Sequence, residues 1–457
     1  METIIIIVFV AGYLAITLEH SLKIDKLVPA LVMMAICWAF ISFGVDDFKS
    51  WFDSSSHKLL NNFFDFSHEE KMVLLEETLL HHLGKTAEIL VFLIGAMTIV
   101  EIIAYFDGFS NIKNFIKTKN KTKLLWILCW LAFILSAIID NLTATIVLIS
   151  LLQKLVNDKE MRIWFAGLII IAANAGGAFS PIGDVTTTML WIAKKVSTPH
   201  LFGYLLLPSL FCMIIPTFIA SKLSVFKGNL EIDSDDNNTQ GKFSSVMLWL
   251  GLSAIIFVPI FKMLTHLPPY VGMMLSLGIV AIFAEIYGSK YNSDKSDVVG
   301  HVSPVHHSLS KIEFPSILFF LGILMAVAAL ESLGILFGFA DWLKESTPHI
   351  GTEVVGAGVS DLVVILLGVG SAVIDNVPLV AASLGMFSEP MDDILWHFIA
   401  YSAGTGGSML IIGSAAGVVA MGMEKINFFW YLKKISWLAL VGFICGAIVF
   451  FFTRTLF

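Results

Sequence analysis

Charged side chains are scarce in this chain of 457 residues. Asp, Glu, Lys and Arg together make up 14% of it, whereas 57% of the residues are apolar. An average soluble domain is about one-quarter charged, so this balance excludes an ordinary globular protein whose surface is mostly exposed to water. The net charge of −8 comes largely from acidic loops such as residues 231–236, and it gives no reason to expect a nucleic-acid partner.

Cysteine and nucleotide-binding motifs are equally rare. The four cysteines, Cys37, Cys129, Cys212 and Cys445, fall in apolar segments without paired spacing. This favours small buried side chains over disulfides or a cysteine metal site. The chain lacks a Walker loop and a dinucleotide fingerprint, so we expect neither ATP-driven transport nor a cofactor. We expect a protein that is not an enzyme.

Apolar runs long enough to cross a bilayer, which takes about 20 helical residues, are abundant. They lie at residues 3–18, 27–45, 88–106, 203–221, 245–263, 269–288, 313–335 and 429–453. Such runs predict an all-α polytopic membrane protein in contact with the lipid bilayer. The segment 46–85 predicts an external amphipathic or irregular connection.

Three pieces of sequence occur twice in the same order. Residues 92–95 (FLIG) match 319–322 (FFLG), residues 136–141 (SAIIDN) match 371–376 (SAVIDN), and residues 176–183 (GGAFSPIG) match 406–413 (GGSMLIIG). The second pair is 235 residues apart and the third is 230 residues apart. Matches in the same order predict an internal duplication.

In each copy an Asp-Asn pair interrupts an apolar run near its middle, at residues 140–141 and 375–376. The two apolar arms on either side of each pair are too short to cross the bilayer. They therefore predict re-entrant helical hairpins with their tips inside the membrane. Basic residues flank the first hairpin, whereas acidic residues follow the second. Because basic loops stay in the cytoplasm, the hairpins enter from opposite faces, which predicts two inverted-topology repeats around one midplane site.

Three carboxylates within these segments, Asp140, Asp375 and Asp184, are candidates for an ion or proton pathway, since charge inside the bilayer is costly. The alternative for Asp140 and Asp375 is capping of the helix after each tip, and one residue can do both. Residues 174–188 concentrate glycine, proline and oxygen-bearing side chains. They predict a broken transmembrane helix that can coordinate a hard cation. The alternative is a proline kink with threonine hydroxyls bonded back to the helix.

The two copies differ at the position of Asp184, where the second copy has Ser414. We therefore expect the first copy to carry more of the negative charge. Further candidate oxygen donors are Ser402, Thr405, Ser408, Ser414, Ser180 and Glu88.

A cation site with a spare carboxylate predicts exchange, because Na⁺ or Li⁺ and a proton compete for the same negative charge. A partly desolvated aspartate takes up a proton near neutral pH and releases it when the cation arrives. Asp140 and Asp184 are equal candidates for that role.

At these motifs the chain resembles the NhaD-type Na⁺/H⁺ antiporters of the ion transporter superfamily, which includes dicarboxylate and arsenite carriers. The resemblance covers nearly the whole chain and depends on residues 139–145 (IDNLTAT), 174–187 (NAGGAFSPIGDVTT) and 404–414 (GTGGSMLIIGS). It implies ion-site residues at Asp140, Asn141, Thr143, Asn174, Asp184, Thr186, Thr187 and Asn376. Those expected to hold Na⁺ or Li⁺ are Asp140, Asn141, Asp184 and Thr187.

The resemblance also implies a homodimer in the bacterial inner membrane, with a scaffold domain, a transport domain that moves as an elevator, and a role in pH homeostasis. We expect the scaffold to begin with N-terminal helices and the external connection in residues 1–87. The other expected parts are a first repeat at 88–221 with its hairpin near 122–155 and its broken helix near 163–195, loops and two scaffold helices at 222–312, and a second repeat at 313–457 with its hairpin near 352–388 and its broken helix near 396–424.

The residues leave two other functions open. A Na⁺-coupled carrier of dicarboxylates or oxyanions would hold its anion at the hairpin tips, where Asp140 and Asp375 place opposing negative charge. An intramembrane aspartyl protease would use the same two acids as a catalytic pair. The Gly-x-Gly-Asp motif expected of such a protease is absent from the sequence.

Overall fold

The computed structural model describes most of the chain. The residues outside the description are 54–57, 61, 116–117, 231–242, 294–302, 337, 340–341, 343–358, 374–375 and 457. The candidate Asp375 and the first part of the predicted second hairpin therefore lie outside the described residues.

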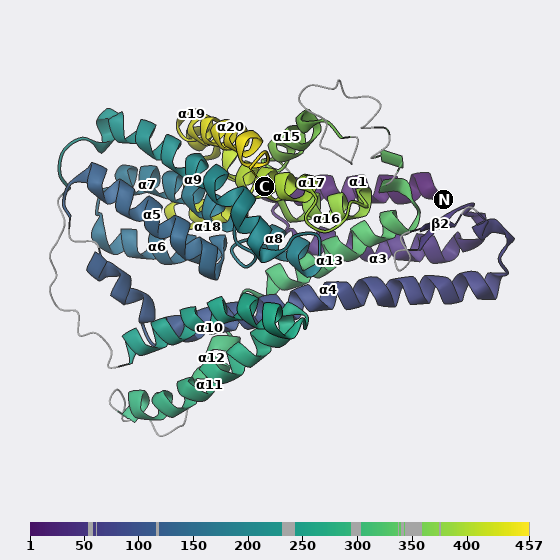
Figure 1. The fold of residues 1–457 in the computed structure, drawn as a ribbon, viewed down its shortest axis with the longest axis horizontal. Coiled ribbons are helices and arrows are strands. Elements are labelled where there is room, and N and C mark those ends of the chain that lie inside the picture. The colour runs from purple at the N-terminus through teal and green to yellow at the C-terminus, as the bar shows by residue number, and fades with distance from the viewer. Residues whose placement is uncertain are drawn as a thin grey trace.

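Eight helices in the described part of the chain are long and apolar enough to cross a membrane, which confirms the all-α polytopic prediction (Figure 1). They are α4 (His68–Tyr105), α5 (Lys121–Ile139), α7 (Lys159–Ala178), α9 (Thr198–Lys222), α10 (Ser244–Thr265), α11 (Pro269–Ser293), α13 (Phe314–Ser332) and α20 (Ser436–Thr453).

Some predicted spans differ from the observed helices. The first two form the shorter helices α1 (Glu2–Thr17) and α3 (Leu27–Phe43), which are joined through α2 (Glu19–Leu22). The last is divided into α19 (Phe428–Lys434) and α20. The first arm of the hairpin begins at Lys121, next to the expected start near 122, because Asn120 caps α5 by accepting a hydrogen bond from the Lys123 N–H at 3.0 Å.

The largest difference is in the predicted external connection, which ends at residue 67 and not at residue 85. Ser67 and Glu70 form a capping box that starts α4, a helix of 38 residues. At about 1.5 Å per residue it is about 57 Å long, nearly twice the hydrocarbon thickness of about 30 Å. Before it, η1 (Val45–Asp47), the antiparallel strands β1 (Trp51–Asp53) and β2 (Lys58–Leu60), and η2 (Phe63–Asp65) form a small cap.

A helical hairpin, a second pair of consecutive helices and two broken helices form the centre of the molecule. α5 and α6 (Asn141–Leu155) meet at Asp140, and α15 (Asp361–Gly370) is followed by α16 (Asn376–Met386). α7 is followed after a break by α8 (Val185–Ile192). α17 (Ile394–Gly406) leads through η5 (Gly407–Met409) to α18 (Ala415–Glu424). α5 packs on α7, and α15 packs on α17.

The two broken helices run in opposite directions, because each begins where the other ends. Arg162 at the start of α7 forms an ion pair with the buried Glu424 at the end of α18, with Nε and Oε2 3.0 Å apart. At the other end, the Ser197 N–H after α8 donates to Asp392 before α17 at 2.6 Å. Midway, the Asn174 amide donates to Ser414 at 3.0 Å.

The two copies make the same contacts at matching positions. Ser136 on α5 donates to the carbonyl of Ala173 on α7 at 2.6 Å. Ser371, its counterpart, donates to the carbonyl of Ala403 on α17 at 2.9 Å. A Cβ on Gly176 would lie 2.2 Å from the carbonyl oxygen of Phe133, so the close packing of α5 on α7 requires glycine there.

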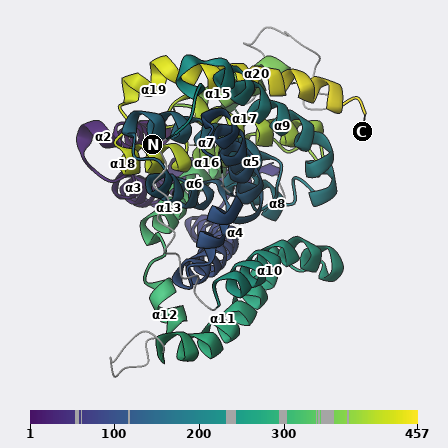
Figure 2. The ribbon, with the colours of Figure 1, turned by 90° about the vertical axis from the view of Figure 1, so that its left-hand side faces the viewer.

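The remaining helices surround this centre. α9 packs on α20, and α1 and α13 pack on α3. α10 and α11 form a hairpin against α4. Figure 2 shows this hairpin with α12 (Pro304–Leu309) on the far side of α4 from the broken helices. The short turns η3 (Gly108–Phe115) and η4 (Ser224–Phe226) complete the described elements.

We expect Gly176→Ala to destabilise the protein, because the added methyl group would overlap the Phe133 carbonyl oxygen. Overpacking of this kind costs about 1–3 kcal/mol, so the thermal unfolding midpoint in detergent should fall. Gly422→Ala on α18 is the matched control, since its Cβ would meet nothing within 4 Å. Equal midpoints for the two variants would contradict the packing argument.

Asp392 should stabilise the junction between α8 and α17 at neutral pH. Burial alone would raise the pKa of Asp392, but the neighbouring His397 side chain and the hydrogen bond from the Ser197 N–H lower it to about 2. A lowered pKa means stability that is present above the unfolded value of about 3.9 and is lost as pH falls towards 2.

Asp392→Asn should therefore lower the unfolding midpoint at pH 7. The position has φ of 63°, a conformation that asparagine tolerates, so the variant isolates the charge. The difference between wild type and variant should shrink as the pH is lowered from 5 towards 2. A difference that stays constant over this range would show that the charge makes no contribution.

Candidate functional site

The tip of the first hairpin is built around Asp140. Its backbone has φ of 96°, which is rare for a residue with a side chain. One carboxylate oxygen accepts from the Thr143 N–H at 2.7 Å, and the other accepts from the Thr143 hydroxyl at 2.8 Å. Asp140 is thus the cap of α6, and Thr143 orients its carboxylate.

Asp184 lies at the break between α7 and α8 and is only 2% exposed. One carboxylate oxygen accepts from both the N–H and the hydroxyl of Thr186 at 2.9 Å. The other accepts from the Asn141 amide at 2.8 Å and from the Asn376 amide at 3.2 Å. These donors are all neutral, so they orient the carboxylate without cancelling its charge.

Amide side chains connect the two copies through this carboxylate. The Asn141 amide also donates to Asn174 at 3.0 Å. Asn174 in turn donates to Ser414, whose hydroxyl accepts from the Gly417 N–H and so caps α18. The site therefore includes both helix breaks and both hairpins, with Asn376 as the described contribution of the second hairpin.

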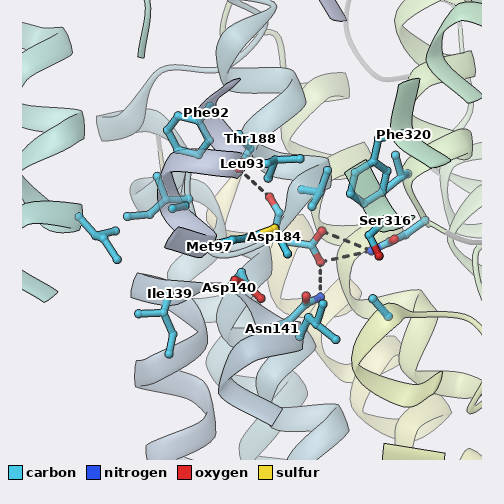
Figure 3. Close-up of a pocket in the computed structure, with 18 of the residues that line it drawn as sticks. Phe92, Leu93, Met97, Ile139, Asp140, Asn141, Asp184, Thr188, Ser316 and Phe320 are labelled. Carbon is cyan, nitrogen blue, oxygen red and sulfur yellow. Dashed lines mark hydrogen bonds between the residues drawn. The ribbon is translucent and has the colours of Figure 1, made fainter. Parts of the chain in front are cut away.

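A cavity of about 60 Å³, called here the site cavity, adjoins these groups, and it has room for a few water molecules. Asp140, Asn141, Asp184 and Asn376 provide polar atoms of its wall. Apolar side chains from α4 complete it, and Ser316 faces it from α13 (Figure 3). The carboxylates thus face a small, mostly apolar space between different parts of the fold.

The other hydroxyls of the first break bond to the backbone. Thr187 and Thr188 both donate to the carbonyl oxygen of Asp184 at 2.9 Å, and Ser180 donates to the carbonyl of Ala137. The alternative of threonine hydroxyls bonded back to the helix is thus correct for Thr187 and Thr188. Thr186 instead bonds to the Asp184 carboxylate.

The candidates of the second copy occupy different places. Ser408 donates to the carbonyl of Thr405 at 2.6 Å, and Thr405 donates to that of Tyr401 at 2.6 Å. The buried Ser402 hydroxyl has no hydrogen-bond partner among the described residues. None of these three side chains lines the site cavity.

Glu88 also lies away from the site. It lines a separate cavity of about 360 Å³ at the other end of α8, together with Lys85, Lys194, Lys195 and Glu331. The structure therefore places Glu88 apart from Asp140 and Asp184.

Three polar residues of the cavity wall were missing from the candidates. Thr188 follows Asp184 by four positions and so shares its helix face, a spacing that the sequence shows. Lys26 and Ser316 come from distant segments, and no local pattern points to them.

Comparisons with known proteins show the family of the chain. The family model described as a citrate transporter matches residues 13–398. Sodium/proton antiporter 1 of Arabidopsis thaliana is 40% identical over 448 residues, which cover 96% of this chain and 70% of that protein. Na(+)/H(+) antiporter NhaD of Vibrio cholerae serotype O1 is 31% identical over 468 residues, covering 97% and 90%. The chain belongs to this transporter family, in the branch of the NhaD-type sodium/proton antiporters.

A solved structure agrees at the level of the fold. The YdaH transporter of Alcanivorax borkumensis, described as having an unusual topology, superimposes with a TM-score of 0.55. It is 12% identical, and the match covers 92% of this chain and 97% of that one. This likeness, together with the family match, identifies a multi-pass membrane transporter.

Thr186→Val should destabilise the site, because valine keeps the shape but lacks the hydroxyl that donates to Asp184. Removing a hydrogen bond to a charged group costs about 1.5–3 kcal/mol, so the unfolding midpoint should fall. Thr186→Ser keeps the donor and is the matched control. If the valine variant is as stable as the serine variant, the bond contributes nothing to folding.

Proposed function

We propose that this protein is a secondary active antiporter that exchanges Na⁺, or Li⁺, for protons. The observation that carries this proposal is the Asp184 carboxylate, 2% exposed and held by neutral donors beside a small cavity that it shares with Asp140. An ionisable group within a membrane protein marks an ion or proton path. The relatives named sodium/proton antiporters support the same activity.

In this mechanism a cation and a proton compete for the same negative charge. A hard cation takes oxygen ligands, and Asp140, Asn141 and Asp184 offer them at the cavity wall. Thr187 donates its hydroxyl hydrogen to the Asp184 carbonyl, so the bond would have to rearrange before Thr187 could turn towards an ion. Protonation of either aspartate reduces the attraction for the cation, which couples the two fluxes.

Alternating access by elevator motion is part of the proposal. The hairpins and broken helices would form the transport domain, and α1, α3, α4, α10, α11 and α13 would contribute the scaffold. The opposite directions of the broken helices and the matching contacts of the two copies support inverted repeats. Homodimerisation through the scaffold rests on the family resemblance.

The bacterial inner membrane and a role in pH homeostasis also remain proposals. Relatives named NhaD come from bacteria such as Vibrio cholerae, whereas other antiporter relatives come from a plant. A multi-pass protein is compatible with a bacterial membrane and with a plant membrane.

A carboxylate carrier is the second candidate, because the matching family model is described as a citrate transporter. The site argues against it, since Asp140 and Asp184 place negative charge where an anionic substrate would bind. A protease is disfavoured because both carboxylate oxygens of Asp140 accept hydrogen bonds from Thr143, and the relatives are transporters.

The test is proton movement in liposomes that contain the purified protein and a trapped pH-sensitive dye. A pulse of external Na⁺ or Li⁺ should make the lumen alkaline as protons leave in exchange, and K⁺ and citrate serve as comparison ions. Asp184→Asn should abolish the Na⁺ response, since the variant removes the charge for which cation and proton compete.

Glu160→Gln, at an exposed position on α7, is the matched control and should behave as wild type. Retained Na⁺ exchange in Asp184→Asn would exclude this carboxylate as the carrier of the exchange. Saturable citrate uptake without any cation response would support the carboxylate carrier instead.

A further inference from the structure

The site cavity adjoins a second cavity of about 100 Å³, called here the outer cavity. Four residues line both of them and define the neck between them: Lys26, Leu142, Ser316 and Ala415. Leu142 and Ala415 belong to the first turns of α6 and α18, whereas Lys26 directly precedes α3 and Ser316 belongs to the first turn of α13. The neck thus lies between the helices that carry the acids and a separate group of helices.

Charge is distributed unevenly along this route. The outer cavity is lined by Glu19, Asp25 and Glu313, and the site cavity by Asp140 and Asp184. Lys26 is the basic side chain among the described residues that line the two cavities. A single ammonium group therefore lies between an acidic mouth and the acidic ion site.

Packing holds Lys26 at the neck. Its ammonium nitrogen lies 4.5 Å from the centre of the Phe319 ring, a favourable cation–π distance. The residue directly precedes α3, where the Asp25 carboxylate accepts from the Leu27 N–H at 2.9 Å. α3 is in turn fixed to α13 by the Trp38 indole, which donates to the Met325 carbonyl at 2.8 Å.

We propose that Lys26 is a tethered counter-cation of the ion site, which weakens cation binding in this arrangement of the helices. Its positive charge attracts the ionised carboxylates of Asp140 and Asp184 and repels an approaching Na⁺. Lys26 and the acids belong to different groups of helices. The effect of Lys26 on the site therefore depends on the position of one group relative to the other. Na⁺ is released most readily when the ammonium lies at the neck and is bound when it is distant.

This role rests on the proposed antiport, and in it Lys26 sets the affinity of the site for the cation without needing to touch the ion. Glu19 on α2, Asp25 before α3 and Glu313 before α13 face the outer side of the neck. They attract cations to the mouth, so the lysine acts between a region that concentrates Na⁺ and the site that binds it.

The experiment measures Na⁺-driven proton movement in the full-length protein in liposomes, as a function of Na⁺ concentration and pH. Lys26→Gln should lower the half-saturating Na⁺ concentration about fivefold, the order of effect that a unit charge has across a small cavity of intermediate dielectric constant. The midpoint of the pH profile should move to higher pH, because removing a positive charge favours protonated carboxylates.

Lys26→Arg keeps the charge and should stay near wild type in both measurements. Lys26→Met keeps the apolar stem on Phe319 and should reproduce Lys26→Gln, which separates charge from packing. Lys23→Gln, at an exposed lysine that lines neither cavity, is the matched control. A purely structural role would lower the rate without moving the half-saturating concentration or the pH midpoint.

The outcomes separate the two proposals. In one outcome the wild type exchanges Na⁺ for protons while Lys26→Gln and Lys26→Met leave the half-saturating Na⁺ concentration and the pH midpoint unchanged. That result overturns the role of Lys26 and leaves the antiport standing. Wild type that moves no protons with Na⁺ or Li⁺ overturns the antiport itself. If Lys26→Gln does not fold, Lys26→Met decides the question.

Discussion

A carboxylate inside a membrane protein has to be held by donors that leave its charge available, and the centre of this molecule is arranged around that constraint. Asp184 receives hydrogen bonds from Thr186, Asn141 and Asn376. An unbroken helix would use its own backbone donors internally, so the carboxylate depends on the break before α8 for the exposed N–H group. The helix breaks and hairpin tips are thus where the ion chemistry becomes possible.

The same constraint explains why the two broken helices are bound together so firmly. Their opposite directions bring both breaks to one level, where Asn174 connects them through Ser414. The Arg162–Glu424 pair and the contacts of Asp392 close the two ends. A break weakens a helix because backbone groups lose their partners, and these contacts restore a rigid frame around the weakened segments.

The wall of the site comes from two groups of helices, and this division links structure to transport. Carboxylates and amides project from the hairpin tips and from the break before α8, whereas α4, α10, α11 and α13 supply half of the apolar wall. Sliding one group against the other would change the surroundings of the carboxylates without rearranging their hydrogen bonds. Among the described residues of this wall, Lys26 is the basic one. Its position outside the helices that carry the acids makes the electrostatics of the site depend on the sliding of the two groups.

The sequence by itself determined the membrane class, the duplicated Asp-Asn tips and the broken segment around Asp184, because each is a local pattern of apolar runs, glycine, proline and acids. It did not show that α4 begins at His68, since a capping box can start a helix in a polar segment. Only the tertiary structure placed Lys26 and Ser316 at the site and Glu88 away from it. Those positions depend on contacts between segments hundreds of residues apart, and no local sequence pattern encodes such contacts.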